Sequence, residues 1–240
     1  MSILFMIRHG QASFGQANYD ELSELGRHQS RILGERLLHS GVRFDAVYSG
    51  TLARQIDTAD ISLSALASMD SGVPPIQQMD AFNEYDSESV LRGLIPVMEN
   101  EDPDFKKDVE TIFDDKKSFQ RVFEKVMLRW VSGDYDAPGL VTWKEFYNYV
   151  EQGIRHIMNA GDRGRNVALF TSGGPVSVAV GKALHLTGPD TLRVSWQVVN
   201  SSISCFKYNQ HGFMLSTFND HSHLEAGSGQ PHGGGLITYR

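Results

Sequence analysis

The first residues that could carry out chemistry follow a short apolar run. Residues 3–7 are all apolar, and Arg8, His9 and Gly10 come directly after them. A neutral imidazole can act as a nucleophile or carry a proton, and a guanidinium can bind an anion. Two interpretations are open here: a strand leaves the core through a polar turn, or it delivers His9 to a reaction site.

A second arginine, Arg54, lies near the start of a helix expected over residues 52–66. A cation in the first turn of a helix is unfavourable by about 0.3–1 kcal/mol, because this end of the helix carries partial positive charge. An anion beside Arg54 would offset that cost. The alternative is a surface arginine paired with Asp57 or Asp60.

Three segments share one pattern, in which an apolar run ends in a polar turn and a helix follows. The apolar runs, predicted as strands, lie at 3–7, 44–48 and 167–170. The helices are expected over 23–38 with Ser23 as N-cap, over 52–66 with Thr51 as N-cap, and from Pro175 as first helical residue. This alternation predicts an α/β fold with a mostly parallel sheet sandwiched by helices. Ligands bind beyond the carboxyl ends of such strands, so all three turns are candidates for one site.

Two further regions complete the organisation. Two later strands are predicted near 202–208 and 213–218. The Asn-Gln-His-Gly segment at 209–212 that joins them predicts a hairpin, and therefore an antiparallel edge strand. Residues 90–150 are mostly helical in pattern, and 99–125 combines dense mixed charge with an apolar stripe. The stripe fits an amphipathic helix packed on the core or an inserted lid that limits substrate size, and the two are compatible. We expect one domain over 1–240 with a helical lid at about 90–150.

Composition narrows the class of protein. The chain has 240 residues, 40% hydrophobic and 21% charged, which is typical of a soluble globular protein. No apolar run approaches the roughly 20 residues of a membrane helix, and the first run does not fit a secretory signal. The single cysteine, Cys205, excludes an internal disulfide, and we expect it in the core. A cytoplasmic location fits these features.

The net charge of −7 argues against nucleic acid as a partner. It would also repel a phosphorylated substrate at long range. Any phosphate site must therefore be a local cluster of arginines and backbone amides.

Several motifs occur in a fixed order along almost the whole chain. They are Arg8-His9-Gly10, Leu22-Ser23-x-x-Gly26-x-x-Gln29, Tyr48-Ser49-x-x-x-Ala53-Arg54-x-x-x-Thr58-Ala59, Phe82-Asn83-Glu84, the strand–Ser-Gly-Gly–helix unit at 167–175, Asn200-Ser201-Ser202, and Asn219-Asp220-His221-Ser222-His223-Leu224. With this ordered set the chain resembles the histidine phosphatase superfamily, which has the phosphoglycerate mutase-like fold.

The resemblance implies a role for four residues. His9 would attack phosphorus and form a phosphohistidine, which requires an unprotonated ring nitrogen and a fixed tautomer. Arg8 and Arg54 would hold the non-bridging phosphoryl oxygens. Glu84 would be the general acid and then the base, so we expect its pKa to be raised.

Further residues would bind phosphate or substrate. Gly10 would allow the backbone to approach phosphate, and Gly173 and its neighbour Gly174 would offer amide donors at a helix N-terminus. Gln11, Ser13 and Gln16 follow the nucleophile and are also candidates, although turn chemistry explains them equally well. We expect no cofactor and no metal. His221, His223 and His232 fit a strand end and a tail, and the other histidines fit surface or capping positions.

Two departures from the family pattern bear on the reaction. Ser172 stands where the family usually has a second histidine, so the site loses a possible cation but keeps a hydroxyl that can still donate to phosphate, and we expect Ser172 to bind phosphate or substrate. After Gly10 the chain continues with Gln11 rather than the Trp-Asn pair of the mutase branch, which favours a phosphatase. We therefore expect a metal-independent phosphatase acting on a small phosphomonoester. The alternatives are a phosphate-binding or interacting pseudoenzyme, a phosphoglycerate-type mutase, and a phosphatase that acts on a phosphoprotein. Substrate and oligomeric state are left open.

Overall fold

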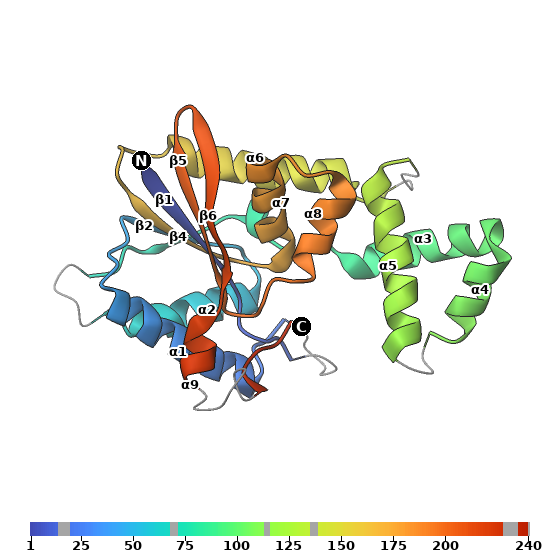
Figure 1. Ribbon diagram of the computed structural model, residues 1–240, viewed down its shortest axis with the longest axis horizontal. Coiled ribbons are helices and arrows are strands. Elements are labelled where there is room, and N and C mark those ends of the chain that lie inside the picture. Colours follow the sequence, from blue (N-terminus) through green and yellow to red (C-terminus); the bar gives the residue numbers. More distant parts are fainter. Residues whose placement is uncertain (14–19, 68–71, 113–115, 135–138, 228–234, 240) are drawn as a thin grey trace.

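A six-stranded sheet forms the centre of the computed structural model, which describes residues 1–13, 20–67, 72–112, 116–134, 139–227 and 235–239. Its strands are β1 (Ser2–Arg8), β2 (Ala46–Ser49), β3 (Ile76–Gln78), β4 (Asn166–Thr171), β5 (Ile203–Asn209) and β6 (Gly212–Asp220). They lie in the order β3-β2-β4-β1-β5-β6 (Figure 1). The first four are parallel, while β5 and β6 run antiparallel as a hairpin at one edge. The predicted α/β class, mostly parallel sheet and hairpin are confirmed.

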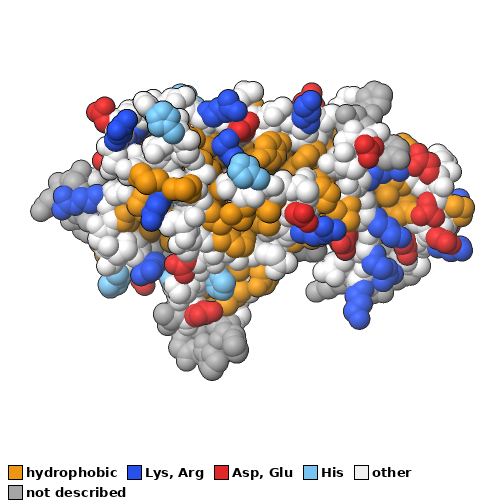
Figure 2. Space-filling model, turned by 45° about the horizontal axis from the view of Figure 1, so that its top comes forward, with side chains coloured by type: hydrophobic (Ala, Val, Ile, Leu, Met, Phe, Trp, Pro, Cys, Tyr) orange, Lys and Arg blue, Asp and Glu red, His pale blue; other side chains and the backbone are white. Residues whose placement is uncertain are grey.

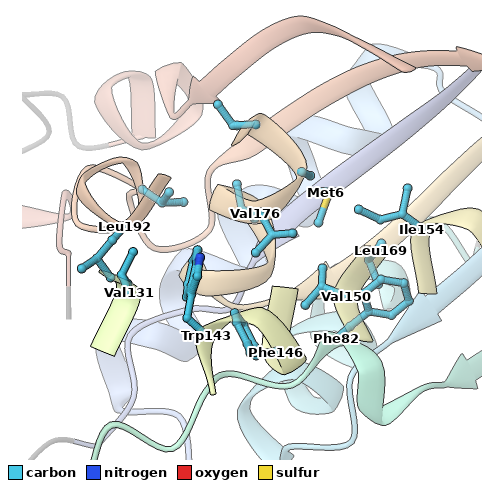
Figure 3. Close-up of a cluster of buried hydrophobic side chains, with 14 of the residues drawn as sticks. Met6, Phe82, Val131, Trp143, Phe146, Val150, Ile154, Leu169, Val176 and Leu192 are labelled. Carbon is cyan, nitrogen blue, oxygen red and sulfur yellow. The ribbon is translucent and has the colours of Figure 1, made fainter. Parts of the chain in front are cut away.

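Helices cover both faces of the sheet. Helices α1 (Glu24–Ser40) and α2 (Ala53–Ser64) lie on one face, and α6 (Trp143–Asn159) and α7 (Gly173–Leu184) lie on the other (Figure 1). Because side chains alternate along a strand, β1 sends Leu4 and Met6 into one buried cluster and Ile7 into the other. Figure 3 shows Met6 among side chains of the α6 and α7 layer. The turns after β1, β2 and β4 therefore emerge from a rigid, close-packed base.

The helix starts agree with the sequence at one position and differ at two. Ser23 caps α1 as predicted, accepting a hydrogen bond from the Gly26 amide at 3.0 Å. Thr51 is not the cap of α2, which begins at Ala53 after Leu52. Helix α7 begins at Gly173, so Pro175 is its third residue rather than its first. Proline is tolerated there because the first four helical amides have no partner within the helix.

Three helices form an arm that projects from the sheet: α3 (Ser87–Glu101), α4 (Pro103–Glu110) and α5 (Lys116–Ser132) (Figure 1). The arm buries its own apolar residues, such as Phe105 and Val126. Figure 2 shows charged side chains of both signs over it, as expected for a solvated outer face. Helix α6 instead packs on the sheet through Val150 and Ile154. The boundary of the inserted part near residue 150 and its function as a lid stay predictions.

The remaining elements are the short 3-10 helix η1 (Asp80–Phe82), α8 (Gly188–Ser195) and α9 (Ser222–Gly227). Cys205 is half-buried on β5, and burial raises the pKa of its thiol to about 11. His185 ends α7 in the left-handed conformation, whereas His223 is buried. In the described part of the chain, none of the helices combines the length and apolar character needed to cross a bilayer. Neither do those residues gather three or more potential metal ligands.

Candidate active site

The ends of β1 and β4 bring His9 and Ser172 together. Arg8 pairs with Thr171 in the parallel register, so the next residues, His9 and Ser172, are neighbours just beyond the two strands. The His9 amide donates to the Thr171 carbonyl at 2.9 Å. The His9 carbonyl in turn accepts from the Asn200 side chain at 3.1 Å. The backbone of His9 is thus held from both sides, and its side chain is only 4% exposed.

The ring of His9 has a defined tautomer. Its Nδ1 lies 2.6 Å from the Gly10 carbonyl oxygen, which can only accept, so Nδ1 carries the proton. Its Nε2 lies 3.1 Å from Nε of Arg54, which can only donate, so Nε2 presents a lone pair. Burial lowers the pKa of His9 well below 6.5, and Arg54 and Arg8 lower it further. His9 is therefore a neutral imidazole with its unprotonated nitrogen directed toward a cation.

Arg54 is held by a residue that the sequence did not suggest. Its Nη1 donates to Asp20 Oδ1 at 2.7 Å, and its side chain is 8% exposed. The other oxygen of Asp20 accepts from the Ala53 amide at 2.8 Å, at the start of α2. Asp20 therefore offsets the unfavourable placement of a cation in the first turn, and the pairing of Arg54 with Asp57 or Asp60 was wrong.

Arg8 approaches the same site from the end of β1. Its Nη1 donates to the Val198 carbonyl oxygen in the loop between α8 and β5. Gly173 lies alongside, and a Cβ atom there would sit 3.8 Å from the Arg8 guanidinium carbon. Both Arg8 and Arg54 act on the pKa of His9 and on that of Glu84, which places all four side chains in one electrostatic environment.

Glu84 lies after η1 and reaches the start of α7. Its carboxylate accepts from the Gly174 amide, at 3.0 Å to Oε1 and 3.2 Å to Oε2. Burial raises the pKa of Glu84, while the Gly174 amide and the two arginines oppose that rise. The net direction is upward, as a general acid requires. The Gly174 amide is thus engaged by Glu84 instead of being directed at a phosphate.

Ser172 is completely buried and contacts a second unforeseen residue, Gln55 of α2. Gln55 Nε2 donates to Ser172 Oγ at 2.8 Å and to the Phe82 carbonyl at 2.9 Å. The Ser172 side chain makes no capping bond to α7. Its hydroxyl is therefore directed at Gln55 and not at the amides of its own helix.

The predicted phosphate-binding residues are only partly brought together. A Cβ atom at Gly10 would meet the Gly26 carbonyl oxygen at 2.4 Å, so glycine is needed there for close packing against α1. Gln11 accepts from the Ser23 hydroxyl at 2.9 Å, at the cap of α1. The Ser13 amide donates to the Glu21 carbonyl. Gln16 lies outside the described residues.

Two further motif residues hold the backbone of the turn after His9, although the sequence analysis gave them no role. Thr58 Oγ1 accepts from the Gly10 amide at 3.0 Å and donates to the Arg54 carbonyl at 2.7 Å, which links the turn after His9 to the start of α2. Gln29 accepts from the Gln11 amide at 2.8 Å. Motif membership was the available signal for both residues.

Comparison of the sequence with known proteins identifies the family of this chain. The family model of the histidine phosphatase superfamily (branch 1) matches residues 4–127 and 111–221. The mitochondrial serine/threonine-protein phosphatase Pgam5 of Caenorhabditis briggsae is 40% identical over 63 residues, which is 26% of this chain and 22% of that protein. A 2,3-bisphosphoglycerate-dependent phosphoglycerate mutase of Gloeothece citriformis is 34% identical over 87 residues, 34% of this chain and 37% of that protein. These matches span well under half of either relative.

Solved structures agree over nearly the whole chain. A phosphoglycerate mutase from Bacillus anthracis has a TM-score of 0.63 at 18% identity, covering 95% of this chain and 96% of that one. A phosphoserine phosphatase from Entamoeba histolytica has a TM-score of 0.61 at 18% identity, covering 93% and 100%. This likeness establishes the fold, and the family match establishes descent. The chain belongs to branch 1 of the histidine phosphatase superfamily.

Proposed function

We propose that this protein is a metal-independent phosphatase that hydrolyses a small phosphomonoester through a phosphohistidine at His9. The observation that carries the proposal is the state of the His9 ring. Its proton is held at Nδ1 by the Gly10 carbonyl, and its Nε2 lone pair lies beside Arg54. A nucleophilic nitrogen beside a guanidinium is the arrangement that attack on a phosphate monoester needs.

In the first step, the Nε2 lone pair of His9 would form a bond to phosphorus while the ester P–O bond breaks. The leaving oxygen would take the proton of Glu84, because burial raises the pKa of this carboxyl and so favours its protonated form. In the second step, the Glu84 carboxylate would accept a proton from water. The water oxygen then bonds to phosphorus as the N–P bond breaks, and inorganic phosphate leaves.

Arg8 and Arg54 would supply the positive charge for the transferring phosphoryl group. Guanidinium groups keep their charge and match phosphoryl oxygens with paired donors. Asp20 fixes the Arg54 side chain, so little reorganisation would be needed when the anion binds. The proposal therefore calls on no metal ion.

A phosphatase is favoured over a mutase by the sequence after Gly10. The structural neighbours include phosphatases named for small phosphorylated compounds. One is a mycobacterial glucosyl-3-phosphoglycerate phosphatase with a TM-score of 0.60 at 17% identity, covering 90% of this chain and 98% of that one. A small phosphomonoester is therefore the substrate class we propose.

The test is turnover of p-nitrophenyl phosphate in the presence of a chelator. We expect the wild type to release phosphate, His9→Ala to abolish release, and His28→Ala, which alters an exposed histidine on α1, to match the wild type. An alkaline quench during turnover should trap phosphorus on His9. Absence of turnover between about pH 5 and 8, the range in which histidine and phosphate dianion titrate, would favour the pseudoenzyme. Phosphate exchange between two phosphoglycerate positions, faster than release to water, would favour the mutase.

A further inference from the structure

Ser172 and Gln55 form a buried polar pair beside the proposed nucleophile. Both side chains are completely buried, and they are in contact although they are 117 positions apart in the chain. Ser172 follows Thr171 at the end of β4, and the His9 amide bonds to the Thr171 carbonyl. Ser172 therefore lies beside His9 at the ends of two neighbouring strands, where a group transferred to His9 would form.

The orientation of the Gln55 amide follows from its backbone partners. Its Oε1 lies 3.3 Å from the Leu52 amide, which can only donate. Its Nε2 lies 2.9 Å from the Phe82 carbonyl, which can only accept. These two contacts therefore determine which end of the Gln55 carboxamide is the oxygen and which is the nitrogen. Nε2 must be the donor toward Ser172 as well.

This orientation determines what the Ser172 hydroxyl can do. A serine hydroxyl has one proton and two lone pairs, and here Gln55 uses a lone pair. Among the residues that the structure describes, the hydroxyl has no acceptor for its own proton. A buried donor without an acceptor is costly unless a ligand supplies one. The ligand that fits beside His9, Arg8 and Arg54 is an oxyanion.

We propose that Ser172 donates its hydroxyl proton to a non-bridging oxygen of the phosphoryl group, and that Gln55 is the positioning residue that aims this hydroxyl. The inference rests on the proposed function and extends it to residues that form an uncharged pair. Because a carboxamide cannot titrate, the pair would stabilise the oxyanion to the same extent at every pH at which the enzyme works.

The test is a double-mutant cycle with orthovanadate as the probe, its affinity measured by calorimetry. Ser172→Ala removes the donor, and Gln55→Met removes the amide while keeping the length of the side chain. We expect each single variant to weaken vanadate binding by about tenfold, the loss of one hydrogen bond to an anion. In the Ser172→Ala background, Gln55→Met should then have less than about a twofold further effect, because its target is gone.

Thr171→Val is the matched control. Thr171 Oγ1 also donates to the Phe82 carbonyl, at 2.7 Å, so this variant disturbs the same carbonyl without touching Ser172. If Gln55 acts only by bracing the Phe82 carbonyl, Thr171→Val will reproduce the loss seen in Gln55→Met, and the proposal fails. It also fails if the two losses multiply. Unchanged affinity in Ser172→Ala, which removes a single atom, overturns it even if Gln55→Met does not fold.

Turnover separates this inference from the proposed function. Coupled losses of vanadate affinity without p-nitrophenyl phosphate hydrolysis would leave the pair as part of an anion site and refute only the phosphatase. Hydrolysis with independent losses would refute only the pairing. A wild type that does not bind vanadate would refute both.

Discussion

Substituting Gly174 by alanine should disable the general acid without touching the nucleophile. A Cβ atom at this position would lie 2.1 Å from Glu84 Oε1, 3.0 Å from Tyr85 Cδ1 and 3.1 Å from Phe146 Cζ. The two aromatic contacts need shifts of only a few tenths of an ångström. The carboxylate, in contrast, has to move by about 1 Å to reach an ordinary carbon–oxygen separation, and that move also weakens its bonds to the Gly174 amide.

The size of the effect depends on the leaving group. A misplacement of about 1 Å at a reacting group costs on the order of 10²-fold in rate. Only substrates whose leaving oxygen needs a proton should show this loss. We therefore expect kcat for an alkyl phosphate to fall about a hundredfold in Gly174→Ala, and kcat for p-nitrophenyl phosphate, whose leaving group departs as a stable anion, to fall less than about tenfold.

The assay compares both substrates in the wild type, Gly174→Ala, Glu84→Gln and Gly93→Ala. Gly93 is the matched control, because among the described residues a Cβ atom there would meet only Leu140, at 3.7 Å. Gly93→Ala should keep wild-type rates and raise the melting temperature slightly. Equal losses for both substrates in Gly174→Ala, or a wild-type rate for the alkyl phosphate, would show that Glu84 is not the acid held by this amide.

Three further variants test the supporting structure. Asp20→Ala should lower kcat/KM about tenfold, because Arg54 loses its contact with the Asp20 carboxylate. It should also destabilise the protein by about 1 kcal/mol, because α2 loses an N-terminal acceptor. Unchanged kinetics and an unchanged melting temperature would contradict this. Burial lowers the pKa of His223 from 6.5 to about 4, so the unfolded state binds more protons between these values and stability declines as the pH falls from 6.5 to 4. His223→Leu should reduce that slope by up to about 1.4 kcal/mol per pH unit in urea unfolding, and an unaltered slope would exclude His223 as its source. His185→Gly should raise the free energy of unfolding by roughly 1 kcal/mol, because His185 ends α7 at φ 56°; a lower melting temperature would refute a strain-relief explanation.

The sequence predicted the architecture because each main element carries a local signal. The alternation of apolar strands and capped helices placed the turn containing His9, and the order of the motifs placed Arg54 and Glu84. The place of α6 in the fold was harder to predict from the sequence. The apolar stripe of α6 resembles that of an inserted helix, and only its packing on the sheet through Val150 shows which surface it covers.

Asp20 and Gln55 were missed for a different physical reason. Each acts on a residue far away in the chain, Asp20 on Arg54 and Gln55 on Ser172. No periodicity or cap pattern encodes such a pair. From sequence alone, an acidic residue before a helix is predicted to lie on the surface, and a glutamine inside a helix is predicted to face solvent. Their importance arises only when the parallel sheet brings three turns to one edge.

Burial shifts the pKa values of two groups at the site in opposite directions. Burial disfavours charge, so it lowers the pKa of His9 and raises that of Glu84. Both shifts are in the direction that the proposed nucleophile and the proposed general acid need. Arg8 and Arg54 reinforce the effect at His9 but oppose it at Glu84, so the acid depends on burial outweighing both cations. When a phosphoryl dianion binds between the arginines, it offsets their charge and removes that opposition. Substrate binding should therefore raise the pKa of Glu84 further, and the acid should be most fully protonated when its proton is needed.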